Sequence, residues 1–328
     1  MINFNYVKPS TQKAVIDTLS KDATAQIIAG GTNLVDLMKR GVTAPEKLID
    51  ITGLPLKNIE QQKGFVRIGT LALNSEVAES ELILNKFPLL AKALNAGASP
   101  QLRNMATVGG NMMQRTRCSY FYDTAMPCNK RKAGSGCGAL KGYNRMHAIF
   151  GATDTCIAVH PSDMCVALAA LGANVIISNS KGERKIAFTD FHKLAGTNPE
   201  KDNTLLRGEM ITAVEIPDAN NFAQHATYLK IRDRSSYAFA LISVATALDM
   251  SGGKINNARL AMGGVAHKPW RLTSTENFLK GKAATAENFK QAAALAMKDA
   301  KAFGHNNFKL KLAPNAIVEA LTTISTKA

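Results

Sequence analysis

The sequence has few aromatic residues, no long hydrophobic run and only five cysteines among its 328 residues. Its longest apolar stretch, residues 164–177, is interrupted by Gly172 and Asn174 and falls short of the ~20 residues that a membrane-spanning helix needs, so we expect no membrane insertion. No basic segment followed by an apolar stretch opens the chain, which argues against a signal peptide on this chain. Hydrophobic residues make up 46% and charged residues 20%, a composition that excludes a disordered chain and, at this length, favours more than one domain.

The formal net charge is +15, and a basic excess of this size raises nucleic acid as a partner. The excess is densest in residues 111–157, which carry seven basic and two acidic side chains. The tyrosines do not form a repeated stacking platform with basic residues, and no recognised nucleic-acid-binding module is present. We therefore expect no nucleic-acid partner, and we expect the remaining positive charge to meet acidic surfaces of partner proteins.

Four of the five cysteines fall within 39 residues, at positions 118, 128, 137 and 156. Free thiols, two disulfides, a zinc site and an iron–sulfur cluster are all compatible with four cysteines. Without a secretory signal stable disulfides are disfavoured, and structural zinc sites usually present Cys-x2-4-Cys pairs, whereas the gaps here are 9, 8 and 18 residues. Such spacing favours an iron–sulfur cluster wrapped by a long loop. Cys165 lies in an apolar stretch and is expected to pack in the core.

Two other features of this segment fit an anionic cluster. Basic side chains that could offset its charge are Arg115, Arg117, Lys130, Arg131, Lys132 and Arg145. Glycines that could let the backbone approach the sulfurs are Gly134, Gly136, Gly138 and Gly142.

Two glycine pairs mark candidate phosphate-binding turns. Ala29-Gly30-Gly31-Thr32-Asn33 stands between a predicted strand at 26–29 and a predicted helix at 33–40, and Thr107-Val108-Gly109-Gly110-Asn111 follows a helical stretch at 75–98 that is broken at Pro88. Neither fits G-x-G-x-x-G or the P-loop, which argues against nicotinamide-type Rossmann binding and NTP hydrolysis. Two turns that each expose amide groups beside a Thr and an Asn could hold the two halves of a pyrophosphate.

The rest of the pattern alternates strands and helices. Strands are predicted at 48–51, 66–69, 173–178, 213–217, 226–231, 238–249 and 258–263, and helices at 286–301 and 314–323, with a polar domain boundary at 218–226. The six histidines are spread singly and no metalloprotease or nucleophile motif is present, so we expect no self-contained catalytic group.

The two glycine motifs, extended to Ile27, Ile28 and Leu34 on the first loop, resemble the FAD pyrophosphate loops in flavoprotein subunits of molybdenum hydroxylases of the xanthine dehydrogenase and carbon monoxide dehydrogenase type. Matches that keep the family's order are His160-Pro161-Ser162-Asp163, Gly208-Glu209-Met210-Ile211 leading to Glu215-Ile216-Pro217, Lys230 with Arg234, Ala261 to Val265, and His305 to Lys309. The resemblance covers essentially the whole chain.

The resemblance implies an α+β fold. Residues 1–220 would form a two-subdomain FAD-binding domain of the PCMH (vanillyl-alcohol-oxidase-like) type, with subdomains at about 1–53 and 54–220. Residues 221–328 would form a smaller C-terminal α+β domain of the CO dehydrogenase flavoprotein type. Most members run directly from the second loop to the Ser-Asp element, whereas this chain carries an insertion at about 112–157. Such an insertion with a [4Fe-4S] cluster resembles the flavin subunit of periplasmic aldehyde oxidoreductase, and the run from Cys128 to Cys137 favours that subset.

The site residues implied by the resemblance fall into two sets. The FAD set is Ile27, Ile28, Ala29, Gly30, Gly31, Thr32, Asn33, Leu34, Thr107, Gly110 and Asn111 at the pyrophosphate, with Asp163 and Lys230 at the flavin or its ribityl chain. The cluster set is Cys118, Cys128, Cys137 and Cys156. Many relatives carry an Asp near the flavin where this chain has Ala238, so contacts at the flavin edge differ here.

The implied activity is electron transfer within a heterotrimeric molybdenum-dependent aldehyde oxidoreductase. A large subunit with the molybdenum cofactor would oxidise the substrate, a small subunit with two [2Fe-2S] clusters would relay electrons to FAD on this chain, and an external acceptor would take them up. The alternatives are the equivalent subunit of a 4-hydroxybenzoyl-CoA reductase-like or xanthine dehydrogenase-like enzyme, and a stand-alone flavin oxidase. The expected location is periplasmic, by export of the folded complex on a partner's signal, or else cytoplasmic.

Overall fold

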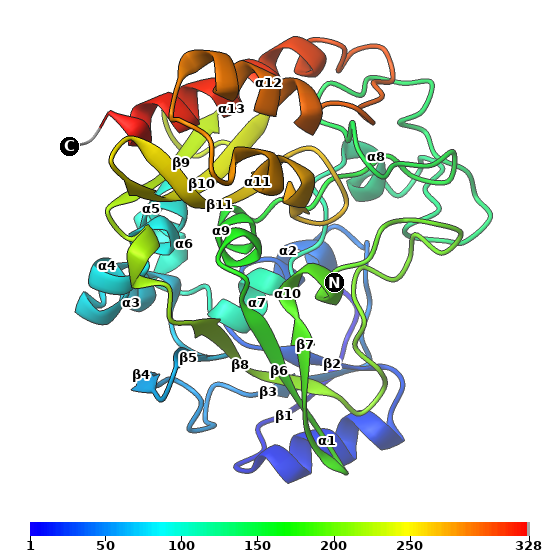
Figure 1. Ribbon diagram of the computed structural model, residues 1–328. Helices are drawn as coiled ribbons and strands as arrows, with labels where there is room; N and C mark the ends of the chain where they lie inside the picture. The colour runs from blue at the N-terminus through cyan, green and yellow to red at the C-terminus, as the bar shows by residue number, and fades with distance from the viewer. Residues whose placement is uncertain (327–328) are drawn as a thin grey trace.

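A computed structural model describes residues 1–326, in which three β-sheets, each with its own helices, follow one another along the chain (Figure 1). The first sheet is parallel, in the order β1-β3-β2 (Asn5–Val7, Lys47–Asp50 and Ala25–Ile28), and is joined by α1 (Gln12–Lys21) and α2 (Leu34–Lys39). Val15 of α1, Ile49 of β3 and Leu71 share one buried core. The predicted βαβ unit at the N-terminus is present, with bounds that shift by one residue.

The second sheet is antiparallel and contains five strands in the order β4-β5-β8-β6-β7 (Ile59–Gln62, Phe65–Gly69, Met210–Pro217, Asn174–Asn179 and Gly182–Ala187). Its helices are α3 (Asn74–Glu79), α4 (Glu81–Lys86), α5 (Pro88–Ala96), α6 (Pro100–Arg103), α7 (Val108–Met112), α9 (Asp163–Ala170) and α10 (Phe188–Phe191). The helical stretch predicted to break at Pro88 has a second break at Ser80, whose backbone is extended. Proline at the first position of α5 costs no hydrogen bond, because that N–H has no acceptor within the helix.

The third sheet, β12-β11-β10-β9 (Trp270–Arg271, Lys254–Gly263, Ile242–Ser251 and His225–Ile231), is antiparallel and follows the 3₁₀ turn η1 (Asn220–Phe222). Helices α11 (Thr273–Leu279), α12 (Ala286–Ala296) and α13 (Lys309–Ser325) belong to this part of the chain, and α12 and α13 lie over the sheet in Figure 1. Along β10, Val244 and Leu248 join the core with α12 and α13, whereas Ala245 and Ala247 join the core with α9. Alternate residues of a strand point to opposite faces, so small alanines let α9 and α5 approach closely.

The insertion between α7 and α9 is irregular apart from the single turn α8 (Ser119–Tyr122). It is fastened to the C-terminal part of the chain by two fully buried side chains. Lys309 donates to the carbonyls of His147 (2.9 Å) and Gly264 (2.7 Å), and Asn306 donates to those of His147 (3.2 Å) and Ala148 (2.9 Å). The fold therefore holds this loop-rich segment at defined points.

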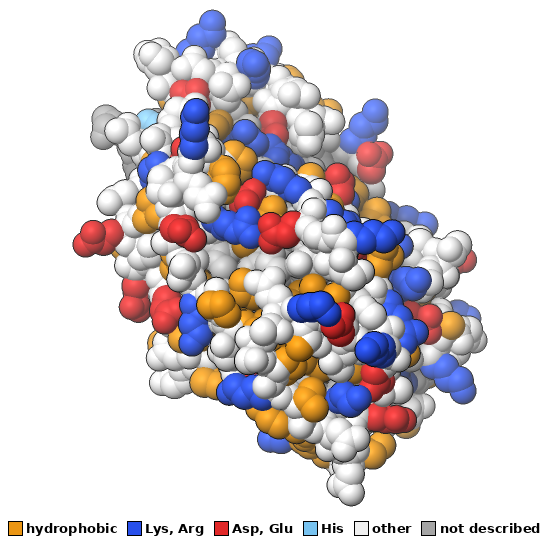
Figure 2. All heavy atoms as spheres, turned by 90° about the horizontal axis from the view of Figure 1, so that it is seen from below, with side chains coloured by type: hydrophobic (Ala, Val, Ile, Leu, Met, Phe, Trp, Pro, Cys, Tyr) orange, Lys and Arg blue, Asp and Glu red, His pale blue; other side chains and the backbone are white. Residues whose placement is uncertain are grey.

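Within residues 1–326, every helix is too short or too polar to serve as a membrane span. On the face seen in Figure 2, Lys and Arg side chains are interspersed with Asp and Glu and are not gathered into a single basic surface.

Candidate cofactor sites

The first glycine loop leads from β2 into α2, and its Gly30 lies against the backbone of Met105 and Ala106, just before the second loop. A Cβ atom on Gly30 would stand 1.8 Å from the carbonyl oxygen of Met105, so only glycine allows this approach. Gly31 has φ +69°, in the left-handed region that favours glycine. The pair thus turns the chain sharply into α2, where the N–H of Val35 donates to the carbonyl of Gly31 at 3.0 Å.

The sequence suggested an open turn at the second glycine pair, but the structure places this pair inside helix α7. Thr107 caps α7, and its Oγ1 accepts the N–H of Gly110 at 3.2 Å. Gly109 packs against Thr70, whose Oγ1 would lie 1.9 Å from an added Cβ. The cap and the close packing fix the start of α7 beside the first loop.

Two adjoining cavities bring together all thirteen residues that the sequence assigned to FAD. A cavity of about 520 Å³ is walled by the first loop and by Thr107 and Gly110. A second, of about 830 Å³, is walled by Asn111, Asp163 and Lys230. Thr32, Asn33 and Gly110 line both cavities, so the two spaces meet at the glycine loops. Tyr237 and Ala238 also line the larger cavity.

Asp163 and Lys230 form a buried ion pair at the wall of the larger cavity, with Nζ and Oδ2 2.8 Å apart. Tyr228 donates its hydroxyl to Oδ1 of Asp163 at 2.6 Å, and Lys230 also donates to the carbonyl of Ala96 at 2.9 Å. Burial and the charge of Asp163 raise the pKa of Tyr228 well above its usual value, so the phenol stays protonated as a donor. Asp163 is also the first residue of α9, capped by Ser162.

The four insertion cysteines surround one small cavity, although up to 18 residues separate neighbours in the sequence. The backbones of Cys128 and Cys137 pair in an isolated antiparallel β-bridge, and the side chain of Cys118 packs with Cys156 and Ala158. All five cysteines of the chain are free thiols. Burial raises the pKa of the Cys118 thiol to about 11. A hydrogen bond between Cys137 and Cys156 lowers the pKa of Cys137 to about 6 and raises that of Cys156. Four converging thiols are the donor set of an iron–sulfur cluster or of a four-cysteine zinc site.

Two expectations about this segment need correction. Much of its positive charge already has partners, because Arg115 and Lys130 both pair with Asp202, and Arg145 pairs with Asp233. Arg131 instead braces the loop by donating to backbone carbonyls. Gly138 and Gly142 make room for Tyr120 and not for sulfur, because an added Cβ would lie 2.7 Å from its ring at Gly138 and 2.0 Å from its hydroxyl oxygen at Gly142. Sequence alone could not place Tyr120 or Asp202 against these residues.

Helix α2 connects the two candidate sites. Its N-cap residue Asn33 lines both FAD cavities, accepts the N–H of Arg115 at 2.9 Å and donates to the hydroxyl of Tyr122 at 3.3 Å. One turn further on, Leu37 packs against Phe121 and Cys128. A third cavity, of about 320 Å³, runs from Cys118 to Asp163. The cysteine cavity therefore lies directly beside the FAD cavities.

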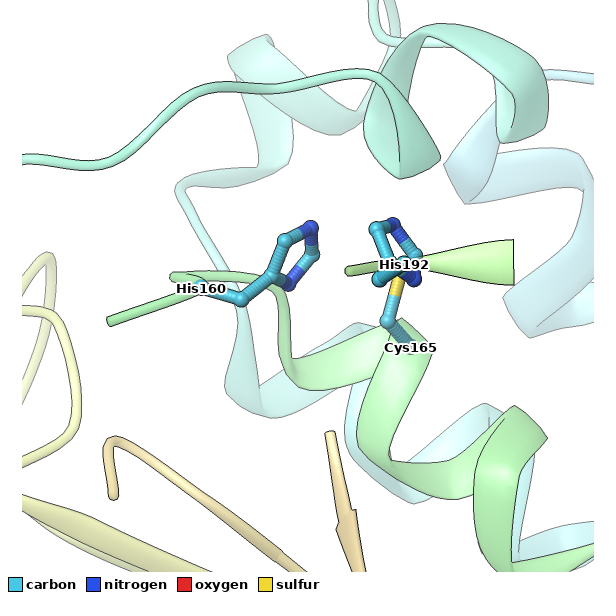
Figure 3. A group of neighbouring side chains, drawn as sticks. All are labelled: His160, Cys165 and His192. Atoms are coloured by element: carbon cyan, nitrogen blue, oxygen red, sulfur yellow. The ribbon is translucent and has the colours of Figure 1, made fainter. Parts of the chain in front are cut away.

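Sequence reasoning missed two histidines near these sites. His147 lies with its Nε2 3.1 Å from the Sγ of Cys118, and burial lowers the pKa of its ring to about 4. His192 packs against His160, and their ligand atoms lie within 4.8 Å of each other and of the sulfur of Cys165 (Figure 3). Cys165 is fully buried in the core, as expected. Isolated histidines carry no spacing signal, so neither contact was readable from the sequence.

The comparisons with known proteins agree with this geometry. Residues 2–219 match the family described as the FAD binding domain in molybdopterin dehydrogenase, and residues 227–324 match the CO dehydrogenase flavoprotein C-terminal domain. The chain is thus an FAD-binding flavoprotein. It belongs to the FAD-binding medium subunits of the molybdenum hydroxylase family, which makes it a subunit of an oxidoreductase.

Among its relatives, the aldehyde oxidoreductase FAD-binding subunit PaoB of Escherichia coli (strain K12) is 43% identical over 99% of both chains. The glyceraldehyde dehydrogenase medium chain of Sulfolobus acidocaldarius is 27% identical over 85% of this chain and 82% of its own. Among solved structures, quinoline 2-oxidoreductase from Pseudomonas putida 86 aligns with a TM-score of 0.76 and 26% identity over 99% of this chain and 97% of that chain. A Cu,Mo-CO dehydrogenase aligns with a TM-score of 0.78 over the whole of both chains at 23% identity, and shares the fold.

Proposed function

We propose that this chain is the FAD- and [4Fe-4S]-containing electron-transfer subunit of a molybdenum-dependent aldehyde oxidoreductase. Electrons come from a small subunit with two [2Fe-2S] clusters and leave to an external acceptor. The observation that carries the proposal is the convergence of four insertion cysteines on one cavity beside the FAD loops. The family models name FAD alone, so the cluster rests on this chain's own cysteines.

For FAD, backbone N–H groups of residues 27–34 bind the pyrophosphate, with side-chain hydrogen bonds from Thr32, Asn33 and Thr107. Gly110 and Asn111 line the same cavities, but their N–H groups donate to the hydroxyl and carbonyl of Thr107, so the expectation that these two amides bind the pyrophosphate is wrong. Asp163 and Lys230, which line the larger cavity, orient the flavin or its ribityl chain. Bound FAD supplies both two-electron and one-electron chemistry. The task of these residues is to bind and orient the cofactor and to exclude water.

For the cluster, Cys118, Cys128, Cys137 and Cys156 serve as thiolate ligands. Their spacing and their approach from separate passages of one loop favour a cluster over zinc, which usually takes closely spaced pairs. Adjacent to them, α2 and the cavity from Cys118 to Asp163 provide a short path between the cluster and the flavin.

The substrate class and the partners come from the relatives. PaoB is named as part of an aldehyde oxidoreductase, and it matches this chain along nearly its full length. We infer the same substrate class here, with oxidation on a large molybdenum-cofactor subunit and with a small [2Fe-2S] subunit between. The isolated chain is then expected to show no bleaching of its flavin by an aldehyde without oxygen. Bleaching would instead indicate a stand-alone flavin oxidase.

The test is cofactor analysis of variants in which one cysteine is replaced, purified without oxygen. We expect Cys118→Ser to lose iron and sulfide but to retain FAD, whereas the matched control Cys165→Ala, a buried thiol outside the insertion, retains both. Iron that persists unchanged in Cys118→Ser, or zinc in place of iron in the wild type, would overturn the cluster. A yellow protein without iron would leave only the FAD half of the proposal.

We further propose that the folded complex is exported to the periplasm on the signal of a partner subunit. Fractionation of the native host tests this directly, because the complex should appear with periplasmic markers. Its recovery with cytoplasmic markers would favour the cytoplasmic alternative.

A further inference from the structure

His147 is not one of the four candidate cluster ligands, but its imidazole contacts one of them, Cys118, directly. Its Nε2 lies 3.1 Å from Sγ of Cys118, within hydrogen-bonding distance of a sulfur. The residue is only 5% exposed, and both His147 and Cys118 line the 320 Å³ cavity described above. The other ring nitrogen, Nδ1, is buried and has no hydrogen-bond partner within residues 1–326.

The backbone at His147 is held in place by the C-terminal part of the chain. Its carbonyl accepts from Lys309 at 2.9 Å and from Asn306 at 3.2 Å, and both side chains are 0% exposed. Its own N–H donates to the carbonyl of Asn144 at 3.0 Å. Because this backbone is fixed on both sides, the ring is preorganised toward the sulfur and loses little freedom when the contact forms.

We propose that His147 donates its Nε2–H to the Cys118 thiolate and thereby raises the reduction potential of the cluster. This inference rests on the proposed [4Fe-4S] cluster. Reduction adds negative charge that spreads onto the ligand sulfurs, and a hydrogen-bond donor stabilises the reduced form more than the oxidised form. His147 is thus a positioning and tuning residue, and it is not an iron ligand.

The ring proton has one favourable position. A buried neutral imidazole carries a single N–H, which is placed either on Nε2 or on Nδ1. A thiolate that ligates iron has no proton to donate, so the contact with Cys118 forms only when Nε2 carries the hydrogen. The opposite tautomer would leave a lone pair of Nε2 facing a thiolate, which is unfavourable.

The experiment is a redox titration of the holoenzyme, monitored by electron paramagnetic resonance, with iron analysis of every sample. His147→Phe removes the donor, and His147→Gln retains an N–H at a similar reach. The control is His305→Phe, because His305 is exposed and its ring faces Tyr143 of the same insertion at 5.0 Å. We expect His147→Phe to lower the equilibrium constant for reduction of the cluster about tenfold, which corresponds to a reduction potential ~59 mV lower for one electron. His147→Gln should lie near the wild type, and the control should not change.

The outcomes separate this inference from the proposed function. If His147→Phe keeps its iron and its potential does not move, the tuning role is wrong. If His147→Phe loses iron, the glutamine variant decides: iron with a near-wild-type potential supports the donor, whereas loss of iron or a lowered potential there assigns His147 to packing. A wild type without four iron atoms would instead overturn the cluster itself.

Discussion

Gly30 offers the sharpest test of how the two glycine loops create the FAD site. In Gly30→Ala, the added Cβ would stand 1.8 Å from the carbonyl oxygen of Met105 and 2.7 Å from its carbonyl carbon. Real Cβ contacts essentially never fall below 3.0 Å, so the loops must separate by about 1.2 Å. The neighbour is backbone and has no rotamer by which to escape. Overpacking of this kind costs ~1–3 kcal/mol of folding free energy.

The same separation weakens FAD binding, because the amide groups of the first loop and the hydroxyl of Thr107 would no longer reach one pyrophosphate together. Each lost hydrogen bond to a charged group is worth ~1.5–3 kcal/mol, or at least about tenfold in the dissociation constant. The assay is titration of the flavin-free chain with FAD, followed by flavin fluorescence, together with thermal melting. The control Gly53→Ala places its Cβ 3.4 Å from the flexible end of Lys8, an ordinary contact.

The reasoning fails if Gly30→Ala binds FAD and melts like the wild type. It also fails if Gly53→Ala is equally impaired, because the effect would then follow from any added methyl group and not from contact between the loops. A variant that melts lower but binds FAD normally would separate the packing cost from cofactor binding, and would contradict the claim that both loops hold the pyrophosphate.

Two further predictions concern buried charge. Burial lowers the pKa of His192 to about 4 and that of His267 to about 3, below the value of ~6.5 in the unfolded chain. Below pH ~6.5 the unfolded chain therefore binds more protons than the folded chain. The free energy of unfolding is then lost as the pH falls, by ~1.4 kcal/mol per pH unit for each ring. The free energy of unfolding, measured with urea between pH 7.5 and 5, should fall with this slope. In His267→Gln the slope should be smaller by the contribution of one proton, ~1.4 kcal/mol per pH unit, and an unchanged slope in that variant would refute the prediction. Asp202→Asn removes the shared partner of Lys130 and Arg115 and should cost ~2 kcal/mol, because Lys130 is left buried while Asp202 itself is a quarter exposed. Asp233→Asn, whose carboxylate is 55% exposed, should cost far less in the same unfolding assay, and equal losses would contradict the account.

The sequence was most informative where function depends on local backbone. Gly30 and Gly31 follow an apolar strand and precede a helix, and this order alone predicted the turn that the structure shows. The second pair, Gly109 and Gly110, was predicted as a turn too, yet it lies in the first turn of α7, directly after the cap residue Thr107. Glycine permits a turn but does not require one, and the cap by Thr107 decides in favour of the helix.

Contacts between distant segments could not be read from the sequence. Lys230 lies on β9 and Asp163 on α9, and their ion pair depends on how the sheet that contains β9 packs on that helix through β10 and β11. Similarly, Lys309 fastens the backbone of His147 across 162 residues, a link that no local pattern encodes. The convergence of the four cysteines was predictable because their number and charge environment are unusual, whereas their neighbours His147 and Tyr120 were not.

The most direct measurement of the central claim is native mass spectrometry of the chain purified without oxygen. It counts the cofactors that one chain holds, and parallel metal analysis identifies the metal. The account predicts one FAD, four iron and four sulfide on the same chain. One zinc, or FAD with four unmodified free thiols in the insertion, would contradict it.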